Sequence, residues 1–351
     1  MSINKSLFGT INNGQEVYLY TITNKSGASV SLHTIGAGIQ AIKVPDKNGV
    51  LGDVVLGFDD PEPYLDGDTG FQGLVVGRVA NRITGAKFSI DGVEYHTPVN
   101  QGEWTLHGGG RISHSIWDVK ETTDNSITFE IFSPDMEDGF PGNFTFTVKY
   151  TFTEDNVLRV DYTILSDKKT VANPTNHAYF NLSCTPNSTI ENHYLKINAD
   201  RFTETDENSL PTGKLCPLAG TILDFAEMHK IGDKIDEPFY NTTEGIGYDN
   251  NYCLTNKLGE FAEAAVLYDE ESGRQLEVYT DLPGIQLYCG GWLPKEPCGK
   301  KGDSTVAYRR GAALETQFYP NSVNFADEFP FTYVEPNKEF KTTTEFRFSV
   351  K

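Results

Sequence analysis

The sequence lacks the features that mark several large classes of protein. Positive charge is scarce, with 29 lysine and arginine residues against 49 aspartate and glutamate residues and a formal net charge of −20 at pH 7. No basic stripe offsets this balance, so the chain would repel the phosphate backbone of a nucleic acid. Anionic membranes and polyphosphates are disfavoured for the same reason. A neutral small molecule is therefore the expected partner.

Cysteine is sparse, and long apolar runs are missing. The five cysteines form no Cys-x-x-Cys pair and none stands near a histidine at zinc-ligand spacing: Cys184, Cys216, Cys253, Cys289 and Cys298. We therefore expect no metal site, no redox motif and no disulfide framework. Residues 1–8 lack the apolar run of a signal peptide, and no run of 18 apolar residues occurs anywhere. This predicts a protein without a membrane span, located in the cytoplasm.

What the sequence does contain is a strong period of two. Residues 144–152 alternate apolar and polar side chains, and residues 157–165 follow after a short turn, which predicts a β-hairpin. Residues 87–90 and 93–95 flank Asp91-Gly92, a pair typical of a type I′ hairpin turn. The remaining strand candidates are Ile127–Phe132, Gln275–Tyr279, Gly284–Cys289 and Glu345–Val350.

Indications of helix are few. Leu223–His229 and Glu260–Val266 each suit a turn or two of helix, although the second suits a strand equally well. Gly36–Ala41 matches a dinucleotide-binding fingerprint, but a strand and a turn follow it instead of the required helix. Strands do not alternate with helices, and no linker divides the chain. We predict an all-β fold, a large antiparallel β-sandwich with few short helices, formed by one domain over residues 1–351.

Three segments place costly polar residues among apolar ones or glycines. Residues 77–83 contain Arg78, Asn81 and Arg82 after an apolar stretch, and buried charges of this kind need partners. For Arg78 a structural pair with a carboxylate is an equally good interpretation. His107 precedes three glycines, which would let a ligand approach its ring closely, although a lone histidine is more often structural.

The third segment, residues 173–182, is the most specific. It combines three asparagines, a threonine, a tyrosine and His177 with apolar neighbours, more hydrogen-bonding groups than plain core packing needs. A histidine held by such neighbours suits acid–base chemistry near neutral pH. Two acidic candidates follow it in the chain. Asp249 lies between tyrosines, and Glu315 follows an apolar run in which burial would raise its pKa. Structural alternatives are a turn cap for Asp249 and an arginine partner for Glu315.

Taken together, these segments resemble one family, the galactose mutarotases or aldose 1-epimerases. The stretches at residues 77–83, 106–109, 173–182, 248–250 and 315–320 occur in the family's order, and the ten-residue signature at 173–182 matches at every position. The resemblance runs from about residue 73 to residue 324. One departure is Asn321, where the family commonly has aspartate after the proline. We expect an effect on the surrounding loop and not a loss of activity.

The resemblance implies the galactose mutarotase-like β-supersandwich, acting without cofactor or metal on free aldohexoses. It implies that Glu315 is the general base at the C1 hydroxyl and that His177 is the general acid at the ring oxygen. His107 would be the second catalytic histidine. The implied substrate-binding residues are Asn81, Arg82, Asp249 and Gln286. The expected partner is a small aldohexose, with no nucleic acid or membrane, and a monomer is slightly favoured.

Three other functions fit parts of this pattern. A glycosidase would use Glu315 and Asp249 as its two carboxyl groups, but the two histidines would then lack a role. A non-catalytic sugar-binding protein would tolerate the loss of Glu315 or His177, yet both are present. A mutarotase-like enzyme for hexose 6-phosphates would share the acid–base pair, and the acidic composition argues against it.

Overall fold

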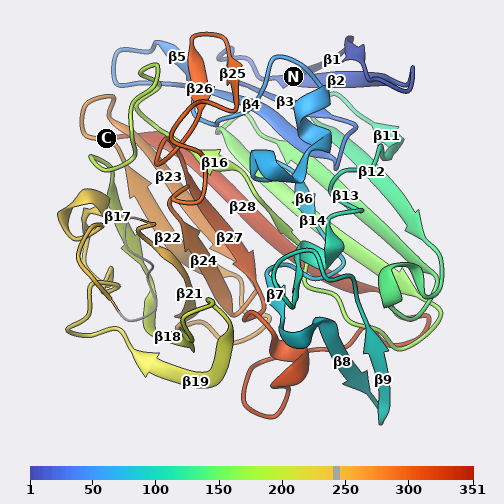
Figure 1. The fold of residues 1–351 in the computed structure, drawn as a ribbon. Helices are drawn as coiled ribbons and strands as arrows, with labels where there is room; N and C mark the ends of the chain where they lie inside the picture. The colour runs from blue at the N-terminus through green and yellow to red at the C-terminus, as the bar shows by residue number, and fades with distance from the viewer. Residues whose placement is uncertain (240–245) are drawn as a thin grey trace.

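The computed structural model describes residues 1–239 and 246–351, and strands dominate it (Figure 1). A nine-stranded sheet contains, in spatial order, β11 (Asp118–Thr122), β12 (Ser126–Ser133), β13 (Phe144–Phe152), β14 (Val157–Ser166), β28 (Phe340–Val350), β23 (Arg274–Thr280), β22 (Ala262–Tyr268), β17 (Tyr194–Ile197) and β20 (His229–Lys230). A six-stranded sheet contains β16 (Tyr179–Phe180), β27 (Ala312–Gln317), β24 (Gly284–Tyr288), β21 (Asp249–Leu254), β18 (Ala199–Thr205) and β19 (Pro211–Pro217).

A five-stranded sheet follows the chain order: β1 (Ser2–Thr10), β2 (Glu16–Thr23), β3 (Ser29–His33), β4 (Gly38–Pro45) and β5 (Leu51–Asp53). Four short pairs complete the strands: β6 (Val75–Val76) with β15 (Thr175–Asn176), β7 (Arg82–Ile83) with β10 (Thr105–Leu106), β8 (Lys87–Ile90) with β9 (Val93–His96), and β25 (Gly299–Lys301) with β26 (Ser304–Val306). All the strand pairs within the three large sheets are antiparallel.

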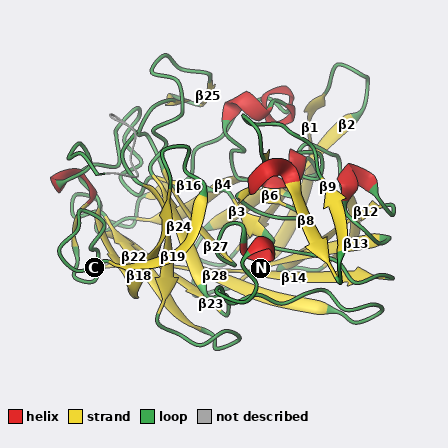
Figure 2. Cartoon of the chain, turned by 60° about the horizontal axis from the view of Figure 1, so that its bottom comes forward, coloured by secondary structure: helices red, strands yellow, loops and turns green. Residues whose placement is uncertain are grey.

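Helical segments in the described ranges are single 3₁₀ turns, which lie in the loops between strands (Figure 2). They are η1 (Glu62–Leu65), η2 (Gly67–Thr69), η3 (Thr84–Ala86), η4 (His107–Gly109), η5 (Glu137–Gly139), η6 (Ile231–Asp233) and η7 (Ser322–Asn324). None of the helices in this part of the chain has the length and hydropathy needed to span a membrane. The prediction of an all-β fold with few short helices is confirmed.

The sheets pack face to face around a shared apolar core. The five-stranded sheet contacts the nine-stranded sheet through Tyr20 and Phe129, whose ring centroids lie 6.3 Å apart. The six-stranded sheet contacts β28 of the nine-stranded sheet through Phe180 and Phe346, whose centroids are 5.1 Å apart. Alternating side chains of β13 and β14 are buried in this core, as a half-buried strand requires. The six-stranded sheet therefore has a rigid support beneath it.

The two predicted hairpins form. β13 pairs with β14 antiparallel, and β8 pairs with β9 across Asp91 and Gly92. Both turn residues have positive φ angles, 50° and 81°, as a type I′ turn demands. Residues 36–41 form a turn and the start of β4 with no helix, so the rejection of a nucleotide site there is also supported.

The prediction of a helix at Leu223–His229 is wrong. The Phe225 carbonyl accepts a hydrogen bond from Ile197 N of β17 (2.8 Å), and the His229 ring bonds the Asp224 carbonyl (2.7 Å). Leu223 and Phe225 are both buried, so alternate side chains face the core. The first contact is made to a distant strand and the second within the segment, and both occupy carbonyls that a helix would use. Of the two alternatives for residues 260–266, the strand is correct, since they lead into β22.

Candidate active site

A cleft of about 250 Å³ opens on the six-stranded sheet, where neighbouring strands carry polar side chains. Glu315 comes from β27, Asp249 from β21 and Tyr179 from β16. Most of the other lining residues lie between positions 67 and 107, in loops, 3₁₀ turns and the short strands β7 and β10. Of the seven predicted site residues, six line this cleft: Asn81, Arg82, His107, His177, Asp249 and Glu315. Gln286 does not, although it lies in the same sheet, on β24 between the strands that carry Glu315 and Asp249.

Glu315 and His177 form a buried acid–base pair. The Glu315 side chain is 2% exposed, and its Oε1 lies 3.5 Å from His177 Nε2. Its second oxygen, Oε2, makes no hydrogen bond with any described residue. The antiparallel register places Glu315 directly opposite Gln286 on β24, deep in the sheet. An unpaired carboxyl oxygen in such a place is expensive unless a ligand uses it.

Burial determines the charge state of this pair. Desolvation raises the pKa of Glu315 well above its usual value; the Asp249 carboxylate raises it further and Arg82 opposes the shift. Desolvation also lowers the pKa of His177 to about 4. Both shifts favour the uncharged form of each group, so the single proton of the pair is favoured on Glu315. Its transfer across the 3.5 Å gap gives the carboxylate–imidazolium form.

His107 is held as a neutral donor. The backbone N–H of Asn81 donates to the ring nitrogen His107 Nδ1 (3.2 Å). The backbone N–H of His107 donates in return to the Asn81 carbonyl (3.0 Å). Because Nδ1 accepts a hydrogen bond, the proton of the neutral ring lies on Nε2. Burial, followed by the charges of His177 and Arg82, lowers the pKa of His107 well below its usual value. Gly108 allows this turn, since a Cβ there would lie 2.5 Å from the Gly77 carbonyl oxygen.

Asp249 lies at the centre of a second polar cluster. Its Oδ1 accepts from Gln286 Nε2 (2.7 Å), its Oδ2 accepts from Trp292 Nε1 (3.2 Å), and Arg82 Nη2 lies 4.0 Å away. Gln286 in turn accepts from Gln317 Nε2 (3.4 Å) and is 3% exposed. Gln286 therefore stands behind Asp249 and orients the carboxylate that faces the cleft. The arrangement offers acceptors and donors to several hydroxyl groups at once.

Comparison with known proteins identifies the family. The family model described as aldose 1-epimerase matches residues 18–347. The chain belongs to the aldose 1-epimerase family. It is 36% identical to rat galactose mutarotase over 350 residues, covering 100% of this chain and 99% of that protein. It is 33% identical to the aldose 1-epimerase of Escherichia coli K12, with coverages of 95% and 96%.

Solved structures agree with this membership. An aldose epimerase homologue from Caenorhabditis elegans superposes with a TM-score of 0.84 at 30% identity, covering 95% of this chain and 98% of that one. A galactose 1-epimerase from Lactobacillus acidophilus gives 0.83 at 25% identity, with coverages of 100% and 99%. These comparisons confirm the family resemblance seen in the motifs. They also confirm the mutarotase fold and the assignment of the chain as an isomerase.

Three side chains in the cleft of this aldose 1-epimerase lie close enough together to be considered as metal ligands. One ligand atom from each of His107, His177 and Glu315 lies within 4.8 Å of the others, and two histidines with a glutamate are a known catalytic zinc set. A histidine that binds metal through Nε2 must carry its proton on Nδ1. That proton would point at the Asn81 N–H, donor against donor. The trio therefore does not fit a metal site.

We accordingly expect chelation to leave the enzyme unaffected. Dialysis against excess EDTA should not change the catalysed rate, because the hydrogen bond from Asn81 leaves the His107 ring unsuited to ligate an ion through Nε2. A polarimetric assay before and after dialysis measures this directly. Loss of activity that added Zn²⁺ or Mn²⁺ restores would refute the prediction.

Several residues of the cleft, among them Phe71, Gln101 and Trp292, were not predicted from the sequence. Phe71 contacts both His107 and His177, with ring centroids 4.8 and 6.1 Å away, and forms an apolar wall beside them. Gln101 and Trp292 line the cleft at its polar side. No sequence pattern links these residues to the site. Only the fold places Trp292 next to Asp249, and Gln101 with Trp104 next to Arg82.

Several polar residues of the family motifs are structural. Asn173 ties the signature to the site strand, donating to the Phe318 carbonyl (3.1 Å) and accepting from the Phe318 N–H (2.7 Å). Arg78 is buried and donates to backbone carbonyls of the loop at residues 133–142, so the alternative of a carboxylate partner is wrong. Asn321 lies outside the cleft, where its amide donates to Thr84 Oγ1 (2.9 Å), which agrees with the expected effect on a loop.

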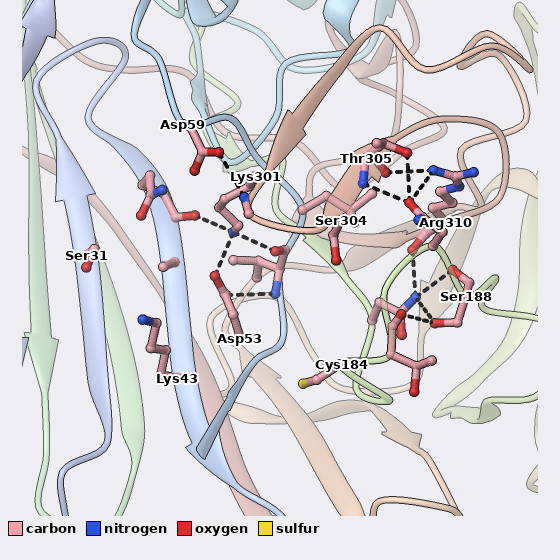
Figure 3. A pocket seen from close by; sticks show the side chains of 18 of the residues that line it. Ser31, Lys43, Asp53, Asp59, Cys184, Ser188, Lys301, Ser304, Thr305 and Arg310 are labelled. Atoms are coloured by element: carbon pink, nitrogen blue, oxygen red, sulfur yellow. Dashed lines mark hydrogen bonds and ion pairs between the residues drawn. The ribbon is translucent and has the colours of Figure 1, made fainter. Parts of the chain in front are cut away.

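A larger cavity, of about 430 Å³, lies elsewhere, between the five-stranded sheet and the β25–β26 hairpin (Figure 3). Its polar groups are bonded to each other. Lys301 Nζ contacts Asp53 Oδ2 (2.9 Å) and donates to the carbonyls of Gln40 and Val55 (2.6 and 2.7 Å), while Arg310 donates to Asn187 (2.7 Å). Among the described residues, none lining this cavity has a buried polar atom without a partner. The smaller cleft, with its unpaired carboxyl oxygen, is therefore the better candidate for the active site.

Proposed function

We propose that this chain interconverts the α and β anomers of free aldohexoses such as D-galactose and D-glucose, with Glu315 as general base and His177 as general acid. The reaction type follows from family membership. The observation that carries the assignment of roles is the buried Glu315–His177 pair, 3.5 Å apart, in a cleft of hydroxyl-binding groups.

The ring opens by transfer of two protons. Glu315 takes the proton of the C1 hydroxyl while His177 gives a proton to the ring oxygen, and the bond between C1 and that oxygen breaks to give the aldehyde. His107, with its proton on Nε2, donates a hydrogen bond to one of the reacting oxygens. Glu315 is then protonated and His177 neutral. Burial favours this neutral distribution, so desolvation assists the opening step.

The ring closes by the reverse transfers. After rotation about the C1–C2 bond, the C5 hydroxyl attacks the other face of the aldehyde and passes its proton to His177. Glu315 returns its proton to the former carbonyl oxygen. The second anomer forms and both side chains regain their starting states. The sugar is neither oxidised nor reduced and no group leaves it, so one acid and one base suffice for the chemistry.

The charge of the cleft supports an uncharged sugar over a hexose 6-phosphate. Arg82 is the only lysine or arginine among its described lining residues, and Asp249 already lies beside it. The lining also contains two further carboxyl groups, those of Asp68 and Glu315. A phosphate dianion would meet repulsion in this setting and would find no unshared cation.

Polarimetry on freshly dissolved α-D-galactose and α-D-glucose tests the proposal. We expect the purified protein to accelerate the approach to equilibrium rotation for at least one of these sugars. Galactose 6-phosphate, assayed in parallel, should react at the spontaneous rate. Acceleration of the phosphate ester alone would favour the second candidate, and acceleration of none would overturn the assigned function.

We also infer a cytoplasmic location and a monomeric state. No disulfide joins any of the five cysteines, all of which lie within the described ranges, and this suits a reducing compartment. The site is formed from residues of one chain, so catalysis needs no second copy. Size-exclusion chromatography with light scattering tests the monomer directly.

A further inference from the structure

A side chain outside the assigned set is oriented to bind the sugar. Gln101 lines the cleft, and its carboxamide oxygen accepts two hydrogen bonds, from Arg82 Nε (3.1 Å) and Trp104 Nε1 (2.8 Å). Both donors are N–H groups that cannot accept. The oxygen of the carboxamide is therefore the end that faces them, and the NH₂ end is directed away. This NH₂ makes no hydrogen bond with any described residue.

The loop at residues 101–104 is built to hold this orientation. Gln101 and Trp104 exchange backbone hydrogen bonds (3.3 and 3.0 Å), which close a tight turn. Gly102 has a φ of 53°, and a Cβ there would lie 2.7 Å from the Trp104 ring. The missing side chain lets the indole fold over the turn and reach Gln101. The amide thus has its position fixed before any ligand arrives.

We propose that Gln101 is a further substrate-binding residue, whose carboxamide NH₂ donates a hydrogen bond to a sugar hydroxyl other than that at C1. The inference rests on the proposed function and adds to it. Sugar hydroxyls are good acceptors, and the other cleft groups near this wall are Arg82 and Asp249, a donor and an acceptor already bonded to neighbours. A preoriented donor at this wall gives the cleft a means to discriminate among aldoses.

Substitution by glutamate separates this role from a structural one. Gln101→Glu keeps an oxygen for Arg82 and Trp104 but removes the NH₂ donor. If Gln101 binds the sugar, Gln101→Glu and Gln101→Leu both raise KM for galactose by about 2- to 12-fold, the worth of one neutral hydrogen bond, with little change in kcat. If Gln101 acts only through Arg82, Gln101→Glu keeps the wild-type KM and the proposal is wrong.

Deoxy sugars identify the hydroxyl. Wild-type protein and Gln101→Leu are assayed by polarimetry with galactose and its 2-, 3-, 4- and 6-deoxy derivatives. We expect one deoxy sugar to lose efficiency with the wild type and to lose no more with the variant, because the same hydrogen bond is removed from either side. Additive losses for every derivative would overturn the proposal.

Two controls keep the interpretation clear. Trp104→Phe keeps an aromatic side chain but lacks the indole N–H, so it should raise KM less than Gln101→Glu. Thermal unfolding of each variant shows whether it is folded, and Gln101→Glu suffices if the leucine variant is not. Failure of the proposed function would appear separately, as a wild-type protein that accelerates none of the sugars.

Discussion

Replacing Glu315 by glutamine will abolish catalysed mutarotation while sugar binding survives. The substitution keeps the shape of the side chain and its place opposite Gln286 but removes the group that accepts the C1 proton. The expected loss in kcat is at least about 10²-fold, the lower bound typical of a general base. Polarimetry measures the rate, and calorimetric titration with galactose measures binding.

The matched control for this variant is Glu121→Gln. Glu121 lies exposed on β11, far in sequence from the site strands, and undergoes the same chemical change. It should retain the wild-type rate. A Glu315→Gln protein that is folded and mutarotates galactose at a near-native rate would show that the base lies elsewhere, and the roles assigned to both members of the pair would have to be abandoned.

Replacing His177 by asparagine will remove most of the rate and change the shape of the pH profile. In the wild type, activity falls below about pH 4, where the pair takes up a second proton and no base remains, because the pKa of His177 is lowered to about 4. It falls again at high pH, where the pair loses its one proton and no acid remains, because the pKa of Glu315 is raised. The two limbs belong to the pair as a whole.

In His177→Asn only Glu315 titrates. The residual rate should therefore rise with pH through the raised pKa of Glu315 and then stay level, without an alkaline limb. The profile of kcat/KM, corrected for the spontaneous reaction, shows this. His96→Asn, a change at an exposed histidine of β9, is the control and should keep the full bell. A complete bell at near-native height in His177→Asn would move the search for the acid to His107.

Much of the fold follows from local patterns. The period of two in residues 144–152 and the Asp91-Gly92 turn need no knowledge of distant partners, and both form as predicted. The error at Leu223–His229 has the opposite cause. Its residues favour a helix locally, but the Phe225 carbonyl accepts a hydrogen bond from Ile197 of a distant strand, which no local pattern indicates. The Asp224 carbonyl is bonded to the His229 ring.

The site divides in the same way. Glu315, His177 and His107 stand in motifs specific enough to be recognised, and they do meet in one cleft. Gln286, predicted to bind the sugar, lies beside the cleft, where its amide donates to the Asp249 carboxylate. Gln101 was not predicted because the orientation of its carboxamide depends on two donors, Arg82 and Trp104. Only the folded loop brings both donors to its oxygen.

The unpaired Oε2 of Glu315 has a consequence for the whole molecule. A buried polar atom without a partner lowers the free energy of unfolding, so the carboxyl group that we propose as the general base works against the folded state. The protein tolerates this because β27 is an interior strand, with β16 on one side and β24 on the other. Catalytic competence and thermal resistance are therefore opposed at this position, and selection for greater heat tolerance alone would tend to remove the enzyme's activity.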